Sequence, residues 1–354
     1  MRAPGLACAS AVFGLSLSAG SPTKVRVEGF SPIPAEAQLV CQARVPGERS
    51  DSGFPATEIF VADADGNHRT QITRQRKLYN HVAVSPDRTQ VAAGRYDHGD
   101  TNGDGRVNSR DQKTLVVLDL ASKQEWAPVP GFDDQAMGGV DWTPDGQWIV
   151  ASMRNGRRID IYRVHPDGSG LENLTQDLGK LVGGPKPAMV SDVSVSFDGQ
   201  WITFLAANSE REPTRIAVMK MDRSEAHYVT DGGGARAQAA GGMWGKGDYD
   251  PEFSPDGQYI SFQRSTNAKL SFGFAPSYDV YRVKIDGTDL KRLSREGNKA
   301  VLGVTDWSKD NRIVFSEWNG EERWVGPVMV NADGSNYHRI EKLKGCTWVR
   351  WIPK

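Results

Sequence analysis

The sequence predicts an all-β protein: a six-bladed β-propeller of four-stranded antiparallel blades. Two alternating motifs and the match between the two ends of the chain predict it. In the first motif, a tight turn of the Pro-Asp-Gly type leads into a strongly β-prone strand, since Asp and Gly suit such turns. Its copies are SPDRTQVAAG (85–94), TPDGQWIVAS (143–152), SFDGQWITFL (196–205), SPDGQYISFQ (254–263) and SKDNRIVFSE (308–317).

The second motif is a β-hairpin with Asp-Gly at its turn, and it alternates with the first motif. Its copies are EIFVADADGNHRTQIT (58–73), IDIYRVHPDGSGLENLT (159–175), YDVYRVKIDGTDLKRLS (278–294) and GPVMVNADGSNYHRI (326–340). TLVVLDLASKQEWAPV (114–129) and RIAVMKMDRSEAHYVT (215–230) fill the two remaining places without Asp-Gly. Each unit therefore has two hairpins in series, and there are six units.

The ends of the chain predict how the ring closes. CTWVRWIPK (346–354) stops where every other unit turns, and AQLVCQARV (37–45) looks like the strand that should follow such a turn. The C-terminal strand is therefore expected to join the N-terminal blade. Closure of this kind removes exposed sheet edges.

The repeats resemble the TolB-like, WD-repeat-like propeller family, and SPDGQYISF and YDVYRVKIDG are the clearest copies. The resemblance covers roughly residues 37–354. It implies the propeller fold and envelope partners, but it says little about the task, because this fold serves many unrelated functions.

Composition and the N-terminus predict an exported protein. The 354 residues carry a formal net charge of -1 and no basic run, which argues against nucleic acid as a partner. There is no apolar stretch of transmembrane length. Residues 1–20 are expected to be a signal peptide, 21–36 a linker or edge segment, and 37–354 the propeller. The expected location is the periplasm or the cell exterior.

The stretch DTNGDGRVNSRD (100–111) predicts a Ca²⁺ site inserted in one blade. It matches an EF-hand or dockerin-like loop, with oxygen ligands at positions 1, 3, 5 and 12, a glycine at 6 and a backbone carbonyl at 7. The expected ligand residues are Asp100, Asn102, Asp104, Arg106, Asn108 and Asp111. Whether the ion is structural or regulatory stays open.

The loops between blades emerge on the same face as this insertion, and that face is the expected binding surface. Candidate residues for a ligand or partner there are His81, Arg95, Asp133, Asp134, Asp192, Trp244, Phe272 and Phe274. At matching positions of the innermost strands, Asp141, Glu252, Asp306 and Arg350 are expected to line the central tunnel, most simply as a solvated wall.

The sequence favours a non-catalytic role, and no catalytic residue is assigned. It has no G-x-S-x-G elbow, and four of its six histidines fall at or beside outer hairpin turns. The leading hypothesis is a calcium-binding propeller that acts as a scaffold for an envelope or extracellular protein. The alternatives are a carbohydrate-active enzyme such as a polysaccharide lyase, or a glycan-binding module, on the loop-bearing face.

Cys41 and Cys346 fall on neighbouring strands of the closing blade. A straight register places Cys41 opposite Val349, which leaves an offset of about 10 Å between the two cysteines. That offset argues against a disulfide unless a bulge intervenes.

Overall fold

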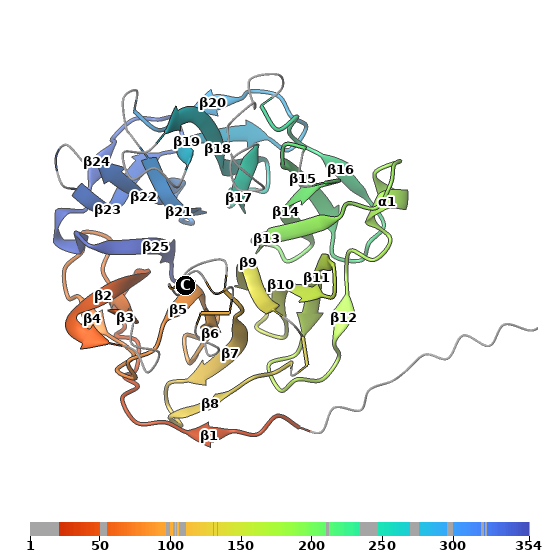
Figure 1. Ribbon diagram of the computed structural model, residues 1–354. Coiled ribbons are helices and arrows are strands. Elements are labelled where there is room, and N and C mark those ends of the chain that lie inside the picture. Colours follow the sequence, from red (N-terminus) through yellow and green to blue (C-terminus); the bar gives the residue numbers. More distant parts are fainter. Residues whose placement is uncertain are drawn as a thin grey trace, which may run out of the picture.

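The computed structural model shows an all-β ring of antiparallel sheets around a central axis (Figure 1). The innermost strands are β5 (Tyr79–Val84), β9 (Asp134–Trp142), β13 (Met189–Val195), β17 (Asp248–Phe253), β21 (Ala300–Trp307) and β25 (Cys346–Trp351) (Figure 1). The residues described are 21–49, 55–96, 100, 101, 103, 105, 111–129, 131, 132, 134–209, 212–233, 247–269, 276–295, 300–319, 322 and 324–353. Within these ranges no helix has the length and apolar character needed to cross a membrane.

Three sheets have four strands each. One contains β25 (Cys346–Trp351), β2 (Leu39–Arg49), β3 (Pro55–Ala62) and β4 (Thr70–Gln71). Another contains β17 (Asp248–Phe253), β18 (Tyr259–Lys269), β19 (Pro276–Lys284) and β20 (Lys291–Arg292). The third contains β21 (Ala300–Trp307), β22 (Arg312–Asn319), β23 (Trp324–Asn331) and β24 (His338–Arg339).

The two remaining sheets are larger. A five-stranded sheet contains β5 (Tyr79–Val84), β6 (Gln90–Arg95), β7 (Thr114–Asp119), β8 (Gln124–Trp126) and the short edge strand β1 (Val25–Arg26). The eight-stranded sheet contains β9 (Asp134–Trp142), β10 (Ile149–Asn155), β11 (Arg158–Val164), β12 (Glu172–Asn173), β13 (Met189–Val195), β14 (Trp201–Ala207), β15 (Arg215–Lys220) and β16 (Ala226–Tyr228). The two short helices described are α1 (Leu178–Leu181) and a 3₁₀ turn (Glu341–Leu343).

The prediction of six separate four-stranded sheets is not what the hydrogen bonding shows. The strands form five sheets, because a single parallel pairing, Ile159 with Met189, joins β11 to β13. Every other pairing in that eight-stranded sheet is antiparallel.

The repeated turns have a local cause. In the copy between β17 and β18, the hydroxyl of Ser254 donates to Asp256 (2.6 Å) and accepts from the backbone N–H of Tyr259 (2.9 Å). Gly257 then has φ of +67°, a region that glycine enters without steric cost. The side chains of Ser254 and Asp256 thus stabilise the turn, and the innermost strand β17 reverses directly into β18.

The core lies between neighbouring sheets rather than at the axis. Leu115 and Val117 of β7 pack with Val140 of β9 and Ile149 of β10 in one buried cluster. Alternate residues of each strand face such a cluster, as expected for strands of period two that are covered on both sides. Several charged side chains of the innermost strands, in contrast, meet at the axis.

The ring closes as the sequence predicts: β25, the last strand, pairs antiparallel with β2. The register is not straight, however. Val40 lies opposite Arg350 and Gln42 opposite Thr347, so β25 contains one extra residue. As a result Cys346 lies opposite Ala43, on the same face of the sheet as Cys41. The offset expected between the two cysteines is therefore too large.

Similar register shifts occur in all the innermost strands. Four of them hold a non-glycine residue at positive φ: His81 (51°), Asp192 (55°), Asp250 (48°) and Trp348 (52°). This conformation is uncommon for such residues, and for a bulky Trp it is strained. The bulges turn these side chains towards the axis, where they line one small cavity.

Candidate functional site

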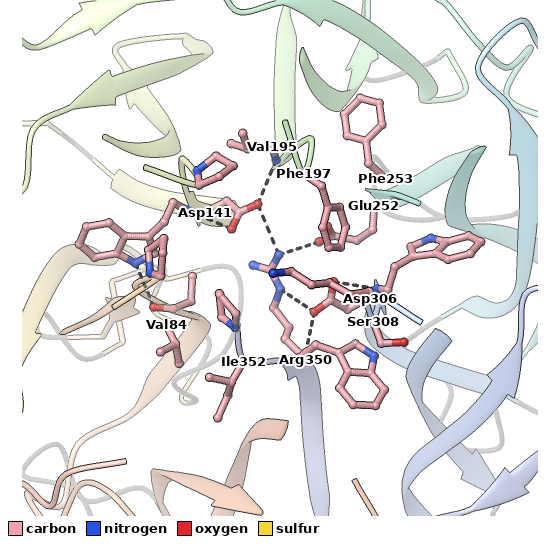
Figure 2. Close-up of a pocket in the computed structure, with 18 of the residues that line it drawn as sticks. Val84, Asp141, Val195, Phe197, Glu252, Phe253, Asp306, Ser308, Arg350 and Ile352 are labelled. Carbon is pink, nitrogen blue, oxygen red and sulfur yellow. Dashed lines mark hydrogen bonds and ion pairs between the residues drawn. The ribbon is translucent and has the colours of Figure 1, made fainter. Parts of the chain in front are cut away.

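Four charged side chains from four strands meet at the axis of the ring. Figure 2 shows the guanidinium of Arg350 (β25) lying between the carboxylates of Asp141 (β9), Glu252 (β17) and Asp306 (β21). The nitrogen-to-oxygen distances are 3.5, 3.1 and 3.6 Å respectively. The sequence placed these four residues at the tunnel from their equal positions in the repeat. The structure adds that they form one buried ion cluster, not a solvated wall.

The cluster is fixed by further hydrogen bonds. Arg350 donates to the backbone carbonyl of Val140 (3.0 Å), and Ser194 donates to Glu252. Asp141 accepts from the backbone N–H of Val195 (2.9 Å), and Asp306 accepts from that of Trp351 (2.6 Å). A buried ion pair is stable only when its remaining polar atoms are satisfied in this way.

Three carboxylates face one guanidinium, so the cluster has an excess of acid. Burial raises the pKa of Glu252 well above its ordinary value, and the neighbouring carboxylates add to the effect against Arg350. Burial likewise raises the pKa of Asp306 to about 6. For Arg350, burial lowers the pKa, but Glu252 and the two aspartates outweigh it and hold the pKa above its usual range. The cluster therefore favours a bound proton or an added positive charge.

A pocket of about 360 Å³ lies over this cluster. Aromatic and apolar side chains form its walls, with the four charged residues at its floor (Figure 2). The wall residues include Trp142, Phe197, Phe253, Trp307, Trp351 and Ile352. Its mouth contains Pro86, Pro144, Ser308 and Lys309, which belong to the turns that follow the innermost strands. We call this side of the ring the turn face.

The pocket has a sequence signal that is easily missed. Trp142 and Trp307 each follow a cluster aspartate, so Asp-Trp recurs at 141–142 and 306–307, and Arg-Trp occurs at 350–351. In a strand, a polar residue at the axis followed by a large aromatic puts the aromatic on the other face of the sheet. On that face Trp142 is 5% exposed and Trp307 is 2% exposed, and both side chains line the pocket.

A second, much smaller cavity of about 10 Å³ lies on the other side of Arg350, away from the turns. It is lined by His81, Asp192, Asp250 and Trp348, among others, and Arg350 and Glu252 line both cavities. Its volume is about that of one water molecule. Two of the predicted face residues, His81 and Asp192, thus come together here, but they are 7% and 6% exposed and lie inside the ring.

The groups around the small cavity have perturbed acidities. Burial raises the pKa of Asp192 to about 7, and burial together with the charge of Asp192 raises the pKa of Asp250 well above its usual value. Burial lowers the pKa of His81, with Lys113 and Arg350 adding to the effect. Within the described part of the chain, Nδ1 of His81 has no hydrogen-bond partner. The imidazole is therefore neutral at pH 7 and faces Trp348 edge to face.

Two other predicted face residues, Arg95 in β6 and Asp134 in β9, form contacts within the ring. Arg95 forms an ion pair with Glu125 of β8. Asp134 accepts a hydrogen bond from the backbone N–H of Lys113 (2.8 Å), and the Lys113 ammonium lies 3.9 Å away. Burial raises the pKa of Asp134, while Lys113 opposes this. The predictions for Asp133, Trp244, Phe272 and Phe274 lie outside the described residues.

Part of the predicted calcium loop is described. The carboxylate of Asp100 accepts hydrogen bonds from the backbone N–H groups of Gly103 and Gly105 (both 2.7 Å). Gly105, at the predicted glycine position, has φ of +79°. Asp111 accepts from the N–H of Thr101 (2.8 Å), so the two ends of the loop meet.

This geometry fits a loop that folds around its first carboxylate. Asn102, Asp104, Arg106 and Asn108 lie outside the described residues. Among the described residues no group of three or more His, Cys, Asp or Glu is placed to hold a metal. The calcium site therefore stays a prediction.

Comparison with known proteins identifies the fold. No family model matches the chain. A putative tricorn protease homolog 2 of Streptomyces coelicolor is 29% identical over 196 residues, which cover 49% of this chain and 15% of that protein. An uncharacterized protein of Agrobacterium fabrum is 28% identical over 128 residues, covering 36% of this chain and 39% of that protein. The matched part thus spans well under half of either curated relative.

Solved structures are similar over most of the chain. TolB from Acinetobacter baumannii has a TM-score of 0.62 at 14% identity, covering 91% of this chain and 68% of that one. A putative TolB from Agrobacterium tumefaciens has 0.57 at 15% identity, covering 95% and 100%. A chain of a nidogen–laminin complex has 0.57 at 9% identity, covering 89% and 98%. At these identities the likeness shows a TolB-like propeller fold and nothing finer.

Proposed function

We propose that this TolB-like propeller is an exported, non-catalytic scaffold that binds a partner protein through the axial pocket of its turn face. The observation that carries the proposal is the pocket itself. Its volume of about 360 Å³ lies in the range of specific ligand sites, and its apolar walls surround a few placed polar groups, as such sites do.

The chemistry of the pocket indicates what it accepts. Aromatic walls favour an apolar or aromatic side chain, and they also stabilise a cation over a ring face. The floor adds three carboxylates to one guanidinium. A long basic side chain, with an apolar stem and a charged tip, satisfies both parts of the site. We therefore expect the partner to insert an exposed Arg or Lys from a loop.

The comparisons support a binding role. The fold is shared with two TolB structures, and one structural neighbour comes from a complex named for two proteins, nidogen and laminin. The TolB likeness and the predicted signal peptide together favour the periplasm or the cell exterior. The protein partner is accordingly expected to be an envelope or extracellular protein.

Two finer features belong to the same proposal. We infer that the ring consists of six units of four strands, since register shifts recur in six innermost strands and one residue pair alone joins β11 to β13. We also propose that loop 100–111 binds Ca²⁺, with Asp100, Asn102, Asp104, Arg106, Asn108 and Asp111 supplying the ligands.

A lyase or a glycan-binding site on the opposite face has weaker support. A sugar would have to reach His81 and Asp192, which are buried beside a cavity of about 10 Å³. That space holds no more than a water molecule. The described residues thus favour binding at the turn face.

Site-specific photo-crosslinking tests the proposal. A photoreactive phenylalanine analogue is placed at Phe197 in the pocket wall, and at Leu290 as the matched control. Leu290 is 47% exposed and lies before β20, outside the pocket residues. Crosslinking is carried out in cells of the source organism. We expect one discrete protein adduct from position 197 that Phe197→Asp weakens in a pull-down and Leu290→Asp does not.

Equal adducts from both positions, or none from position 197 while the protein is folded, would contradict the proposed pocket. An adduct with glycan alone would favour the glycan-binding alternative. Repeating the experiment with Ca²⁺ and with EGTA reports separately on the loop.

A further inference from the structure

The two cysteines of the closing sheet lie in contact across the junction of the chain's two ends. Cys41 is in β2 and Cys346 in β25, and they are 1% and 0% exposed. Both are free thiols, and each perturbs the pKa of the other. Both belong to one apolar cluster with Leu39, Val349 and other residues.

The bulge in β25 brings them together. Because Cys346 lies opposite Ala43, and residues 41 and 43 point to the same face, the two cysteines are diagonal neighbours on that face. A disulfide requires the two sulfur atoms to approach to about 2.0 Å. The extra residue in β25 therefore places the two side chains on one face of the sheet and within one buried cluster, as a disulfide between these strands requires.

The geometry points to a modification site: we propose that Cys41 and Cys346 form a disulfide that locks the closed ring when the protein folds in an oxidising compartment. The bond would join strands about 300 residues apart in the sequence. It would convert the non-covalent closure between β2 and β25 into a covalent one.

The reaction is a thiol–disulfide exchange with a disulfide oxidant, such as oxidised glutathione or an oxidoreductase. The thiolate of one of the two cysteines attacks one sulfur of the oxidant, whose S–S bond breaks and releases one thiol. The other cysteine, as a thiolate, then attacks the protein sulfur of the mixed disulfide and displaces the second thiol. The two cysteines lose two protons and two electrons, and the oxidant becomes two thiols.

Both thiols are shielded from an oxidant in the closed ring. Interaction with Cys41 lowers the pKa of Cys346, whereas burial raises the pKa of Cys41 well above its usual value. Since both sulfurs are covered in the closed ring, exchange takes place before β25 docks or during its transient opening. Oxidation is therefore expected to be fast during folding and slow in the folded protein.

Peptide mapping tests the proposal. The full-length protein is secreted into an oxidising compartment, isolated folded, alkylated without reduction and digested with trypsin. We expect peptide 27–44, which contains Cys41, to be joined to peptide 345–350, which contains Cys346. Reduction should release both peptides and lower the melting temperature, whereas the matched variant Cys41→Ala/Cys346→Ala should melt at the same temperature with and without reductant.

Recovery of both peptides singly alkylated, from protein whose host compartment oxidises a co-expressed disulfide protein, would overturn the proposal. So would a link from either cysteine to Cys8 or to glutathione alone. A second measurement needs no secretion: refolding in a glutathione redox buffer should give the same linked peptides within the folding time. Failure to link there, with a native melting transition recovered, would also refute it.

Discussion

At the centre of the ring, Arg350 contacts carboxylates from β9, β17 and β21, which belong to three other sheets. Arg350→Met keeps the apolar stem but leaves buried acid unpaired. Breaking a buried pair by removing one partner costs about 3–5 kcal/mol. We expect a loss of that order in the free energy of unfolding measured with urea at pH 8. The loss should be smaller at pH 5, where Glu252 and Asp306 bind protons.

The matched control is Arg312→Met at the pocket mouth. Arg312 is 28% exposed and pairs with Asp310, which is 62% exposed, so its removal should cost less than about 1 kcal/mol. Equal effects of the two substitutions, or no pH dependence for Arg350→Met, would show that the axial cluster is not an ion pair that stabilises the ring.

Asp192 gives a pH-dependent prediction. Its pKa rises from 3.8 to about 7 on folding, chiefly through burial, so the folded protein holds this proton more tightly than the unfolded chain. The resulting stability is fully present below pH 3.8 and is lost as the pH rises through 7. Asp192→Asn removes the titration, and Asn tolerates positive φ. We expect the variant to melt roughly 2 °C or more above the wild type at pH 8.

The same comparison at pH 4 should show no advantage for Asp192→Asn, because the wild-type carboxyl is then neutral. The charged and titratable groups facing Asp192 are Asp250, Lys113, His81 and Arg350, so both proteins are compared at one ionic strength. Asp222→Asn, at an exposed turn, is the control and should leave the difference between pH 4 and pH 8 unchanged. A parallel pH dependence of the wild type and Asp192→Asn would contradict the assignment.

Ca²⁺ binding by the inserted loop 100–111 can be tested by removing the charge of Asp100 while keeping the hydrogen bonds that its side chain accepts from the backbone. Asp100→Asn retains an oxygen for the N–H groups of Gly103 and Gly105 but weakens any cation site. We expect Ca²⁺ to raise the melting temperature of the wild type relative to EGTA, through preferential binding to the folded state. Asp100→Asn should lose most of that shift. Equal melting of the wild type with Ca²⁺ and EGTA would exclude the site.

Elements set by local chemistry could be predicted from the sequence, and elements set by packing could not. The turn at Ser254 and Gly257 depends on neighbours in the chain, so its motif predicts it. The axial charges follow from equal positions in the repeat. The contact of Cys41 with Cys346 depends instead on one extra residue in β25, which no alternation pattern shows. The pocket likewise depends on how side chains from many strands pack around the axis.

For the whole molecule, the last strand is expected to be indispensable. β25 supplies the inner neighbour of β2 and also Arg350 at the axis. Deletion of residues 345–354 should leave an open ring with an unpaired strand and unpaired buried carboxylates. We expect this variant to lose its cooperative melting transition and to associate in size-exclusion chromatography. A monomer that melts within a few degrees of the full chain would contradict this role for β25.

The position of Arg350 late in the sequence also affects the order in which the ring can fold. A chain emerging from the ribosome completes β9, β17 and β21 before β25, so Asp141, Glu252 and Asp306 lack the guanidinium of Arg350 until β25 has been synthesised. The first long strand, β2, likewise pairs with β25, which lies about 300 residues later in the sequence. Contacts of such separation form slowly. Closure of the ring is therefore expected to be a late step of folding, because it brings together strands from distant parts of the chain.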